Sequence, residues 1–196
     1  MLRPGVLILA GGRGRRCGGL DKGWIEIHGE ALVARRIRQL SGCDWPIAIS
    51  ANRTLVRYRS LGVPVFVDRH PGFAGPLAAI SAALHEDFGN PLISVPVDTP
   101  DITCALLRRL LDASELGTRA AYACDAARAQ PLVAVWPRAS LEIVDAALRS
   151  EQRAVHSVHS QLGSVAVEFP EDRFTNLNSS ADIEALRHRN RGGVTC

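Results

Sequence analysis

The 196-residue sequence has no segment that is long and apolar enough to cross a membrane. A spanning helix needs about 20 consecutive apolar residues, and no run in this chain approaches that length. A charged N-terminal region followed by a short apolar core, the pattern of a secretory signal, is also absent. We therefore expect neither membrane association nor secretion.

The sequence also lacks closely spaced cysteines. Its cysteines are odd in number, lie far apart and include no C-x-x-C pair. This pattern argues against a disulfide framework and against a zinc site, and it fits a reducing cytoplasm. The five cysteines are Cys17, Cys43, Cys104, Cys124 and Cys196.

Aromatic residues are scarce at 5%, the net charge is only +3, and no run of Lys or Arg is interleaved with aromatics. Nucleic acid is therefore not an expected partner. With 46% hydrophobic residues the chain can bury one sizeable core. Because no repeat, low-complexity segment or linker divides it, we expect residues 1–196 to form a single domain.

The most informative stretch is residues 5–23. An apolar run over residues 6–10 predicts a buried strand, and it ends in a loop with five glycines among residues 11–19. Glycines allow positive φ and a close approach of backbone N–H groups to a ligand, which suits an anion. The loop region also carries four cations, Arg13, Arg15, Arg16 and Lys22. Together these features predict a site for a nucleoside triphosphate.

Two common phosphate-binding motifs do not fit this loop. A Walker A loop requires Ser or Thr after its lysine, but Gly23 follows Lys22. A dinucleotide fingerprint starting at Gly12 would place its third glycine at Cys17. A flexible glycine-rich surface loop is the alternative, which the preceding strand and the closing lysine disfavour.

Strand and helix patterns alternate through the first half of the chain and predict a doubly wound, mostly parallel α/β sheet. Asn52 is predicted as the N-cap of the second helix, and Pro76 opens the third. Strands are predicted over residues 6–10, 24–27, 46–50, 63–67 and 91–97, and helices over 31–40, 54–61 and 77–85.

In such a sheet, ligands bind outside the carboxyl ends of the strands. Gly11, Ser50, Asp68 and Asp98 all lie at the carboxyl ends of predicted strands, so we expect them to face one crevice. Magnesium prefers one or two carboxylates plus phosphate oxygens and water, which makes Asp98 the predicted metal ligand. The alternative for either aspartate is capping the helix that starts near residue 103, and we assign that role to Asp101.

The second half adds antiparallel structure. Strands over 119–124 and 130–136 are predicted to pair across a short loop, followed by helices over 138–148, 155–162 and 181–187 and a strand over 165–169. The tail is expected to be frayed. On the helices, Arg35, Arg36 and Arg38 are predicted to form a solvated face, and His156 and His159 to lie on the surface.

Residues 9–22, LAGGRGRRCGGLDK, resemble the signature L-A-G-G-x-x-x-R-M-G-x-x-D-K of nucleotidyltransferases. The resemblance continues along nearly the whole chain and is greatest to the molybdenum cofactor guanylyltransferases. It includes residues 51–53, Asp68, residues 75–78, residues 98–100, residues 130–131 and residues 174–178, whose late Asn-x-Asn makes the resemblance specific.

This resemblance implies a three-layer, Rossmann-like nucleotidyltransferase fold that transfers GMP from GTP to the terminal phosphate of molybdopterin, with Mg²⁺ as cofactor. It implies a nucleotide-binding half (residues 1–100), an acceptor-binding half (101–190) and a tail (191–196). Transient contacts with molybdenum-insertion or molybdoenzyme-maturation proteins are also expected. Arg16, Lys22 and Asp98 correspond to catalytic residues, with Asp98 as the metal ligand. The nucleotide-binding residues implied are Leu9, Ala10, Gly11, Gly12, Lys22, Ser50, Asp68 and Asp98. Those on the molybdopterin side are Gln130, Pro131, Asn176 and Asn178.

The sequence departs from the family pattern at two of these positions. Cys17 replaces the usual Met, and both side chains are soft and apolar. Ser50 stands where the guanylyl family often has Asn, and a hydroxyl does not present the donor and acceptor pair of an amide. Cytidylyl transfer to the same cofactor therefore stays open, as do nucleotidyl transfer to a sugar or alditol phosphate and a non-catalytic GTP-binding delivery module.

Overall fold

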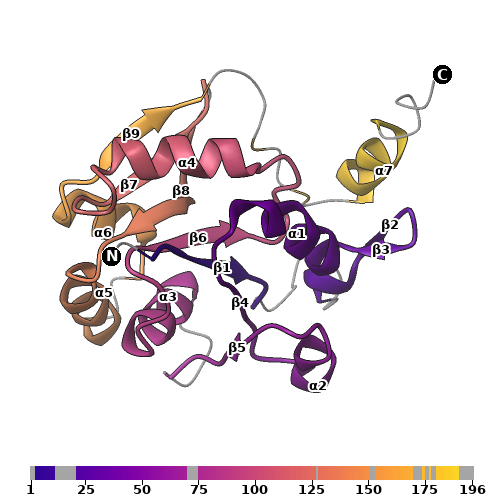
Figure 1. Ribbon diagram of the computed structural model, residues 1–196, viewed down its shortest axis with the longest axis horizontal. Coiled ribbons are helices and arrows are strands. Elements are labelled where there is room, and N and C mark those ends of the chain that lie inside the picture. The colour runs from indigo at the N-terminus through magenta and orange to yellow at the C-terminus, as the bar shows by residue number, and fades with distance from the viewer. Residues whose placement is uncertain are drawn as a thin grey trace.

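The structure is a computed structural model that describes residues 3–11, 21–69, 75–126, 128–150, 153–169, 174, 177 and 180–189. These residues form a seven-stranded sheet in the order β5-β4-β1-β6-β8-β7-β9 (Figure 1). The strands are β1 (Gly5–Leu9), β4 (Ile47–Ser50), β5 (Val65–Phe66), β6 (Leu92–Pro96), β7 (Ala121–Cys124), β8 (Ala129–Trp136) and β9 (Val165–Glu168).

One strand of this sheet runs in the opposite direction to the others. β5, β4, β1 and β6 pair in parallel, whereas β8 runs antiparallel to both of its neighbours, β6 and β7. β9 then pairs in parallel with β7. The predicted mostly parallel sheet with an antiparallel addition is therefore confirmed, and β8 is the reversed strand.

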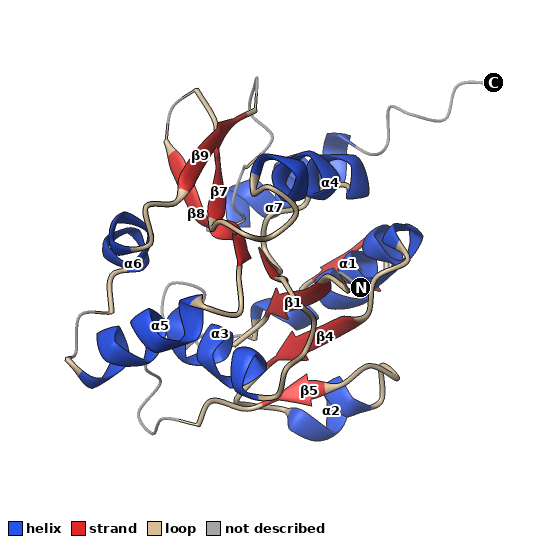
Figure 2. Cartoon of the chain, turned by 60° about the vertical axis from the view of Figure 1, so that its left-hand side comes forward, coloured by secondary structure: helices blue, strands red, loops and turns tan. Residues whose placement is uncertain are grey.

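Helices cover both faces, which gives the three predicted layers. Val6 and Ile8 of β1 point into the cluster formed with α1 and α4, and Leu7 points into the cluster formed with α3, α5 and α6. Figure 2 shows α3 and α5 on one side of the sheet and α1 and α4 on the other. This alternation is the period of two that a strand buried on both faces requires. The helices are α1 (Leu32–Leu40), α2 (Leu55–Arg59), α3 (Pro76–His85), α4 (Cys104–Ala113), α5 (Ser140–Arg149), α6 (Val155–Gln161) and α7 (Ser180–Arg189).

The ends of several elements differ from the prediction. The strand predicted over residues 24–27 is wrong at its start, because η2 (Lys22–Trp24) is a 3-10 turn, followed by the hairpin of β2 (Glu26–Ile27) and β3 (Glu30–Ala31). The two turn residues of this hairpin, His28 and Gly29, have φ of 54° and 77°, as a tight hairpin turn requires.

The two predicted helix caps are also wrong. α2 begins after Thr54, and the Asn52 side chain bonds to Asp68 instead of capping the helix. At α4 the cap is Thr103, whose hydroxyl accepts from the N–H of Leu106 at 3.2 Å, so Asp101 is not the cap. Because Asp68 holds the Asn52 side chain, that side chain is not available to cap α2.

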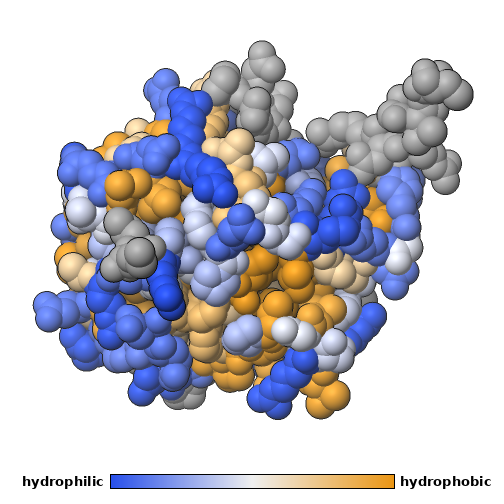
Figure 3. Space-filling model, viewed as in Figure 1, coloured by the Kyte–Doolittle hydropathy of each residue, from blue (hydrophilic) through white to orange (hydrophobic). Residues whose placement is uncertain are grey.

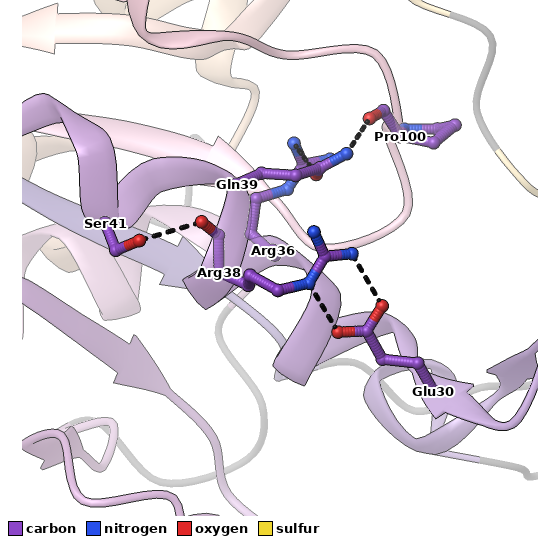
Figure 4. Close-up of polar contacts among 6 residues, drawn as sticks. All are labelled: Glu30, Arg36, Arg38, Gln39, Ser41 and Pro100. Atoms are coloured by element: carbon purple, nitrogen blue, oxygen red, sulfur yellow. Dashed lines mark hydrogen bonds and ion pairs between the residues drawn. The ribbon is translucent and has the colours of Figure 1, made fainter.

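Two side chains predicted to face solvent are buried. Arg36 is 1% exposed and His159 is 3% exposed. Figure 4 shows how the arginines of α1 diverge: Arg38 turns outward to form a bidentate ion pair with Glu30 at 2.8 and 2.9 Å, whereas Arg36 turns inward. The predicted solvated face therefore holds for Arg38 and is wrong for Arg36. His156, by contrast, is exposed as predicted.

One pair of cysteines is joined. Cys43, in the 3-10 turn η3 (Ser41–Cys43) after α1, forms a disulfide with Cys104 at the start of α4. The prediction against disulfides is wrong for this pair, because 61 positions separate the two residues and no local spacing indicates their contact. The bond links the turn that follows α1 to the first residue of α4, on one face of the sheet.

Within the described ranges, no helix has the length and apolar character needed to span a bilayer. The longest helices, such as α3 and α5, have 10 residues, about half of what a span requires. Figure 3 shows a mixed surface, on which hydrophobic residues gather near the centre of the view with hydrophilic residues on both sides.

His159 generates a testable prediction about stability. Its Nε2 lies 2.8 Å from the carbonyl of Pro131 and its Nδ1 lies 2.9 Å from the Ser164 hydroxyl. Because a carbonyl oxygen only accepts hydrogen bonds, Nε2 is the donor to Pro131. Burial lowers the pKa of His159 below its ordinary value of 6.5. Because this pKa is depressed on folding, the neutral ring contributes stability above the unfolded pKa that is lost as the pH falls.

The variant His159→Gln keeps a donor for Pro131 but does not titrate. We expect its Tm to fall less between pH 7 and pH 5 than the Tm of the wild type. Thermal melts across this range measure the effect, and the exposed His156→Gln is the matched control. An unchanged pH dependence in His159→Gln would contradict the assignment.

Candidate functional site

A cavity of about 210 Å³ lies where β1, β4 and β6 end. Six of the residues predicted to bind nucleotide line this cavity. They come from the ends of three strands and from η2. They are Leu9, Ala10, Gly11, Lys22, Ser50 and Asp98. The start of α3 and the middle of β8 complete the wall with Pro76, Ala79 and Leu132.

An ion pair lies in the wall of this cavity. The Lys22 ammonium donates to Asp98 Oδ2 at 2.7 Å and to the carbonyl of Leu177 at 3.1 Å. The N–H of Leu177 in turn donates to the carbonyl of Asp98 at 2.9 Å. Three segments far apart in sequence therefore meet at one point. Both charged side chains are about one-fifth exposed, so they remain accessible from the cavity.

Lys22 is held in place by its neighbour Asp21. One carboxylate oxygen of Asp21 accepts from the Tyr58 hydroxyl at 2.6 Å and from the N–H of Gly23 at 3.2 Å, and the other accepts from the Thr54 hydroxyl at 2.7 Å. Burial and the Asp21 carboxylate both raise the pKa of Tyr58, so its hydroxyl stays protonated and donates.

Gly23 is required by this arrangement. A Cβ on Gly23 would lie 2.3 Å from the Tyr58 hydroxyl, well inside van der Waals contact. The Asp-Lys-Gly sequence thus anchors α2 through its first residue, presents a cation through its second and permits the close approach through its third. Sequence reasoning identified Lys22 and missed the structural role of Asp21, whose partners lie more than 30 positions away.

The end of β1 lies close to the segment that follows β4. A Cβ on Gly11 would lie 3.4 Å from the Asn52 side chain, while the Gly11 backbone stays outside the left-handed region. Since 3.4 Å is an ordinary van der Waals distance, neither close packing nor positive φ requires glycine at this position in the structure. Beside it, the buried Ser50 hydroxyl has no hydrogen-bond partner among the described residues. A buried hydroxyl that lines a cavity is suited to a ligand.

Asp68 does not line the cavity. Its carboxylate accepts from Asn52 Nδ2 at 2.7 Å, and its N–H donates to Asn52 Oδ1 at 2.9 Å. Asn52 therefore connects Asp68 to the cavity wall at Gly11. The position of Asn52 just after β4 could have indicated that it lies beside the cavity. The sequence analysis instead interpreted this position as a helix cap.

A second cavity, of about 280 Å³, adjoins the first. Pro96, Asp98 and Leu132 line both cavities, so the Asp98 carboxylate lies at their boundary. The predicted acceptor residues Gln130 and Pro131 line the second cavity together with Arg128.

Asp125 organises the wall of this second cavity. Its carboxylate accepts from Gln130 Nε2 at 3.0 Å and from the Arg128 N–H at 2.8 Å. The Arg128 side chain is exposed, and its guanidinium has no hydrogen bond or ion pair with the described residues. The wall therefore presents one cation beside an oriented amide. The predictions for Gly12, Arg16, Asn176 and Asn178 fall outside the residues that the structure describes.

Comparisons with known proteins identify the family of this chain. The family model of the MobA-like NTP transferase domain matches residues 6–165. A relative from Acidiphilium cryptum, named molybdenum cofactor guanylyltransferase, is 36% identical over 187 residues and covers 92% of both chains.

Solved structures share the fold at low sequence identity. The chain is similar to molybdopterin-guanine dinucleotide biosynthesis protein A from Archaeoglobus fulgidus, with a TM-score of 0.78, 20% identity and coverage of 96% of this chain and 99% of that one. It is also similar to Rv0371c from Mycobacterium tuberculosis in complex with manganese, with a TM-score of 0.71, 15% identity and coverage of 95% and 98%. Because the family model and the sequence relative both span most of its length, this chain belongs to the MobA-like NTP transferase family of nucleotidyltransferases.

Proposed function

We propose that this chain transfers GMP from GTP to the terminal phosphate of molybdopterin. An oxygen of the acceptor phosphate attacks the α-phosphorus of GTP, the bond from that phosphorus to the bridging oxygen of the β-phosphate breaks, and pyrophosphate leaves. The observation that carries the proposal is the place of Asp98, which lies beside Lys22 at the boundary between two cavities. The names of the sequence relatives support this choice of substrates.

The first cavity is assigned to the nucleotide. Its apolar walls at Leu9, Ala10 and Leu132 suit the flat guanine base, and the Ser50 hydroxyl, which has no partner among the described residues, supplies a hydrogen bond. The triphosphate then extends toward Lys22. Asp68 acts from behind the wall by orienting Asn52, which is a different role from the direct contact that the family resemblance implies.

A divalent metal ion is used generally by NTP transferases of this kind, and we propose Mg²⁺ held by Asp98. The site fits such an ion, because a carboxylate faces the cavity and already attracts a cation, the Lys22 ammonium at 2.7 Å. In the described part of the chain no three His, Cys, Asp or Glu side chains are grouped as metal ligands. A single carboxylate at a phosphate site suits magnesium, which takes its remaining ligands from phosphates and water. When bound, the ion supplies Lewis-acid and templating chemistry.

The chain's own residues position groups and neutralise charge. The Lys22 ammonium binds phosphate oxygens, and Gln130, oriented by Asp125, faces the acceptor. A phosphate monoester is largely ionised at neutral pH, so the attacking oxygen needs no general base from the protein. Pro96 and Leu132 line both cavities and give them a shared apolar wall beside Asp98.

The remaining expectations stay predictions. We propose that both halves of the chain form one catalytic domain, with nucleotide in the first half and acceptor against the second. A cytoplasmic location, and transient contacts with molybdenum-insertion or molybdoenzyme-maturation proteins, follow from the reaction and are untested.

Removing either member of the central ion pair tests the proposal. We expect Lys22→Met and Asp98→Asn each to lower pyrophosphate release from GTP and molybdopterin by at least about 100-fold, the loss typical of a group that stabilises transition-state charge. Circular dichroism should be unchanged. Asp101→Asn, in the same loop, is the matched control and should retain activity. Normal turnover in Asp98→Asn would refute the proposed role.

Ser50 raises one specific alternative, cytidylyl transfer, because it lacks an amide to pair with guanine. We expect pyrophosphate release with molybdopterin to be fastest with GTP when GTP, CTP, UTP and ATP are compared at equal concentration. A preference for CTP would replace guanylyl with cytidylyl transfer and leave the site assignment intact.

Arg128 should serve the acceptor and not the nucleotide. Because a hydrogen bond to a charged group contributes about 1.5–3 kcal/mol, Arg128→Met should raise the KM for molybdopterin by about 10- to 100-fold. The KM for GTP should be unchanged. The control is Arg119→Met, which removes a surface arginine paired with Glu115 outside both cavities. Equal increases in both KM values would argue against a separate acceptor cavity.

A further inference from the structure

Arg36 lies outside both cavities but contacts the loop that carries Asp98. Its side chain is 1% exposed, and its guanidinium donates to the carbonyl of Thr99 and, at 3.2 Å, to the carbonyl of Ile102. It also donates to Gln39 Oε1 at 3.2 Å. A single side chain of α1 therefore binds the backbone on both sides of residues 100–101.

Gln39 completes this contact. It lies one turn beyond Arg36 on α1, and its Nε2 donates to the carbonyl of Pro100 at 3.3 Å, as Figure 4 shows. The two residues thus hold three of the four carbonyls that follow Asp98. The carbonyl of Asp98 itself accepts from Leu177. The peptide planes around Asp98 are therefore fixed from two directions.

Burying a guanidinium in this space has a large desolvation cost. Burial lowers the pKa of Arg36 to about 10, while the nearby Asp101 and Asp98 carboxylates act in the opposite direction. The side chain is still protonated at neutral pH. An apolar side chain of similar volume would avoid the desolvation cost, but it would lack the rigid set of donors that Arg offers to backbone carbonyls.

We propose that Arg36 is a positioning residue for Asp98: together with Gln39 it fixes the loop so that the carboxylate faces the boundary of the two cavities. This inference rests on the metal-binding role of Asp98 in the proposed function. A purely structural role for Arg36 would change stability alone. A positioning role changes metal binding through Asp98 specifically.

The test uses Arg36→Lys and Arg36→Met, each alone and combined with Asp98→Asn. Arg38→Met is the matched control, because Arg38 lies on the same helix but pairs with Glu30 at the surface. Binding of Mn²⁺ to the GTP-loaded protein is measured by electron paramagnetic resonance, and turnover is measured as a function of Mg²⁺ concentration.

We expect Arg36→Met to raise the half-saturating metal concentration by about 10- to 100-fold, as for other residues that orient a metal ligand. Arg36→Lys should show a smaller rise, and Arg38→Met none. In the Asp98→Asn background, Arg36→Met should cause no further loss, because both changes act on the same group.

Wild-type metal binding in both Arg36 variants, with binding lost in Asp98→Asn, would overturn this inference and leave the proposed function standing. An additional loss in the double variant would also overturn it. Wild-type metal binding in Asp98→Asn would instead refute the proposed function, and the inference with it. If Arg36→Met does not fold, Arg36→Lys decides the question, since it keeps the buried charge and loses only the planar donor set.

Discussion

The structure of the site depends on the contact between the Lys22 ammonium and the Asp98 carboxylate. Each group is tied to its own part of the fold: Lys22 through Asp21 to α2, and Asp98 through the following carbonyls to α1. A cation and an anion that are held separately and partly desolvated can each accept a new partner without a large rearrangement. A triphosphate with its metal provides both partners at once.

The sheet explains why Gln130 and Pro131, the residues proposed to bind the acceptor, lie close to this ion pair. Since β8 runs antiparallel to β6, with Ser94 opposite Ala134, the start of β8 extends past the carboxyl end of β6. Gln130 and Pro131 are therefore brought beside Asp98, although they begin their strand. A strand parallel to β6 at this position would place its carboxyl-terminal residues, and not its first residues, beside Asp98. The antiparallel direction of β8 therefore explains why the second cavity lies next to the first.

Much of this arrangement was predictable from the sequence, because strand ends follow from apolar runs and the carboxyl ends of parallel strands share an edge. Gly11, Ser50 and Asp98 were placed in this way, and Lys22 by its place at the end of the glycine-rich loop. The buried contacts were not predictable. Helical spacing puts Arg36 on the same face as Leu32 and Leu40, and Arg38 on the opposite face. The spacing does not reveal the partners of a buried arginine, because the carbonyls that bind Arg36 lie more than 60 positions away. The same distance concealed the bond between Cys43 and Cys104.

Lys22 is the single lysine of the chain, which allows one direct measurement. Reaction of the protein with an amine-specific reagent, followed by mass spectrometry, reports the accessibility of the Lys22 ammonium, with the α-amino group as internal standard. The account predicts that GTP with magnesium slows modification of Lys22 relative to the α-amino group, because phosphate oxygens cover the ammonium. An unchanged rate at Lys22, under conditions in which calorimetry shows GTP to be bound, would contradict it.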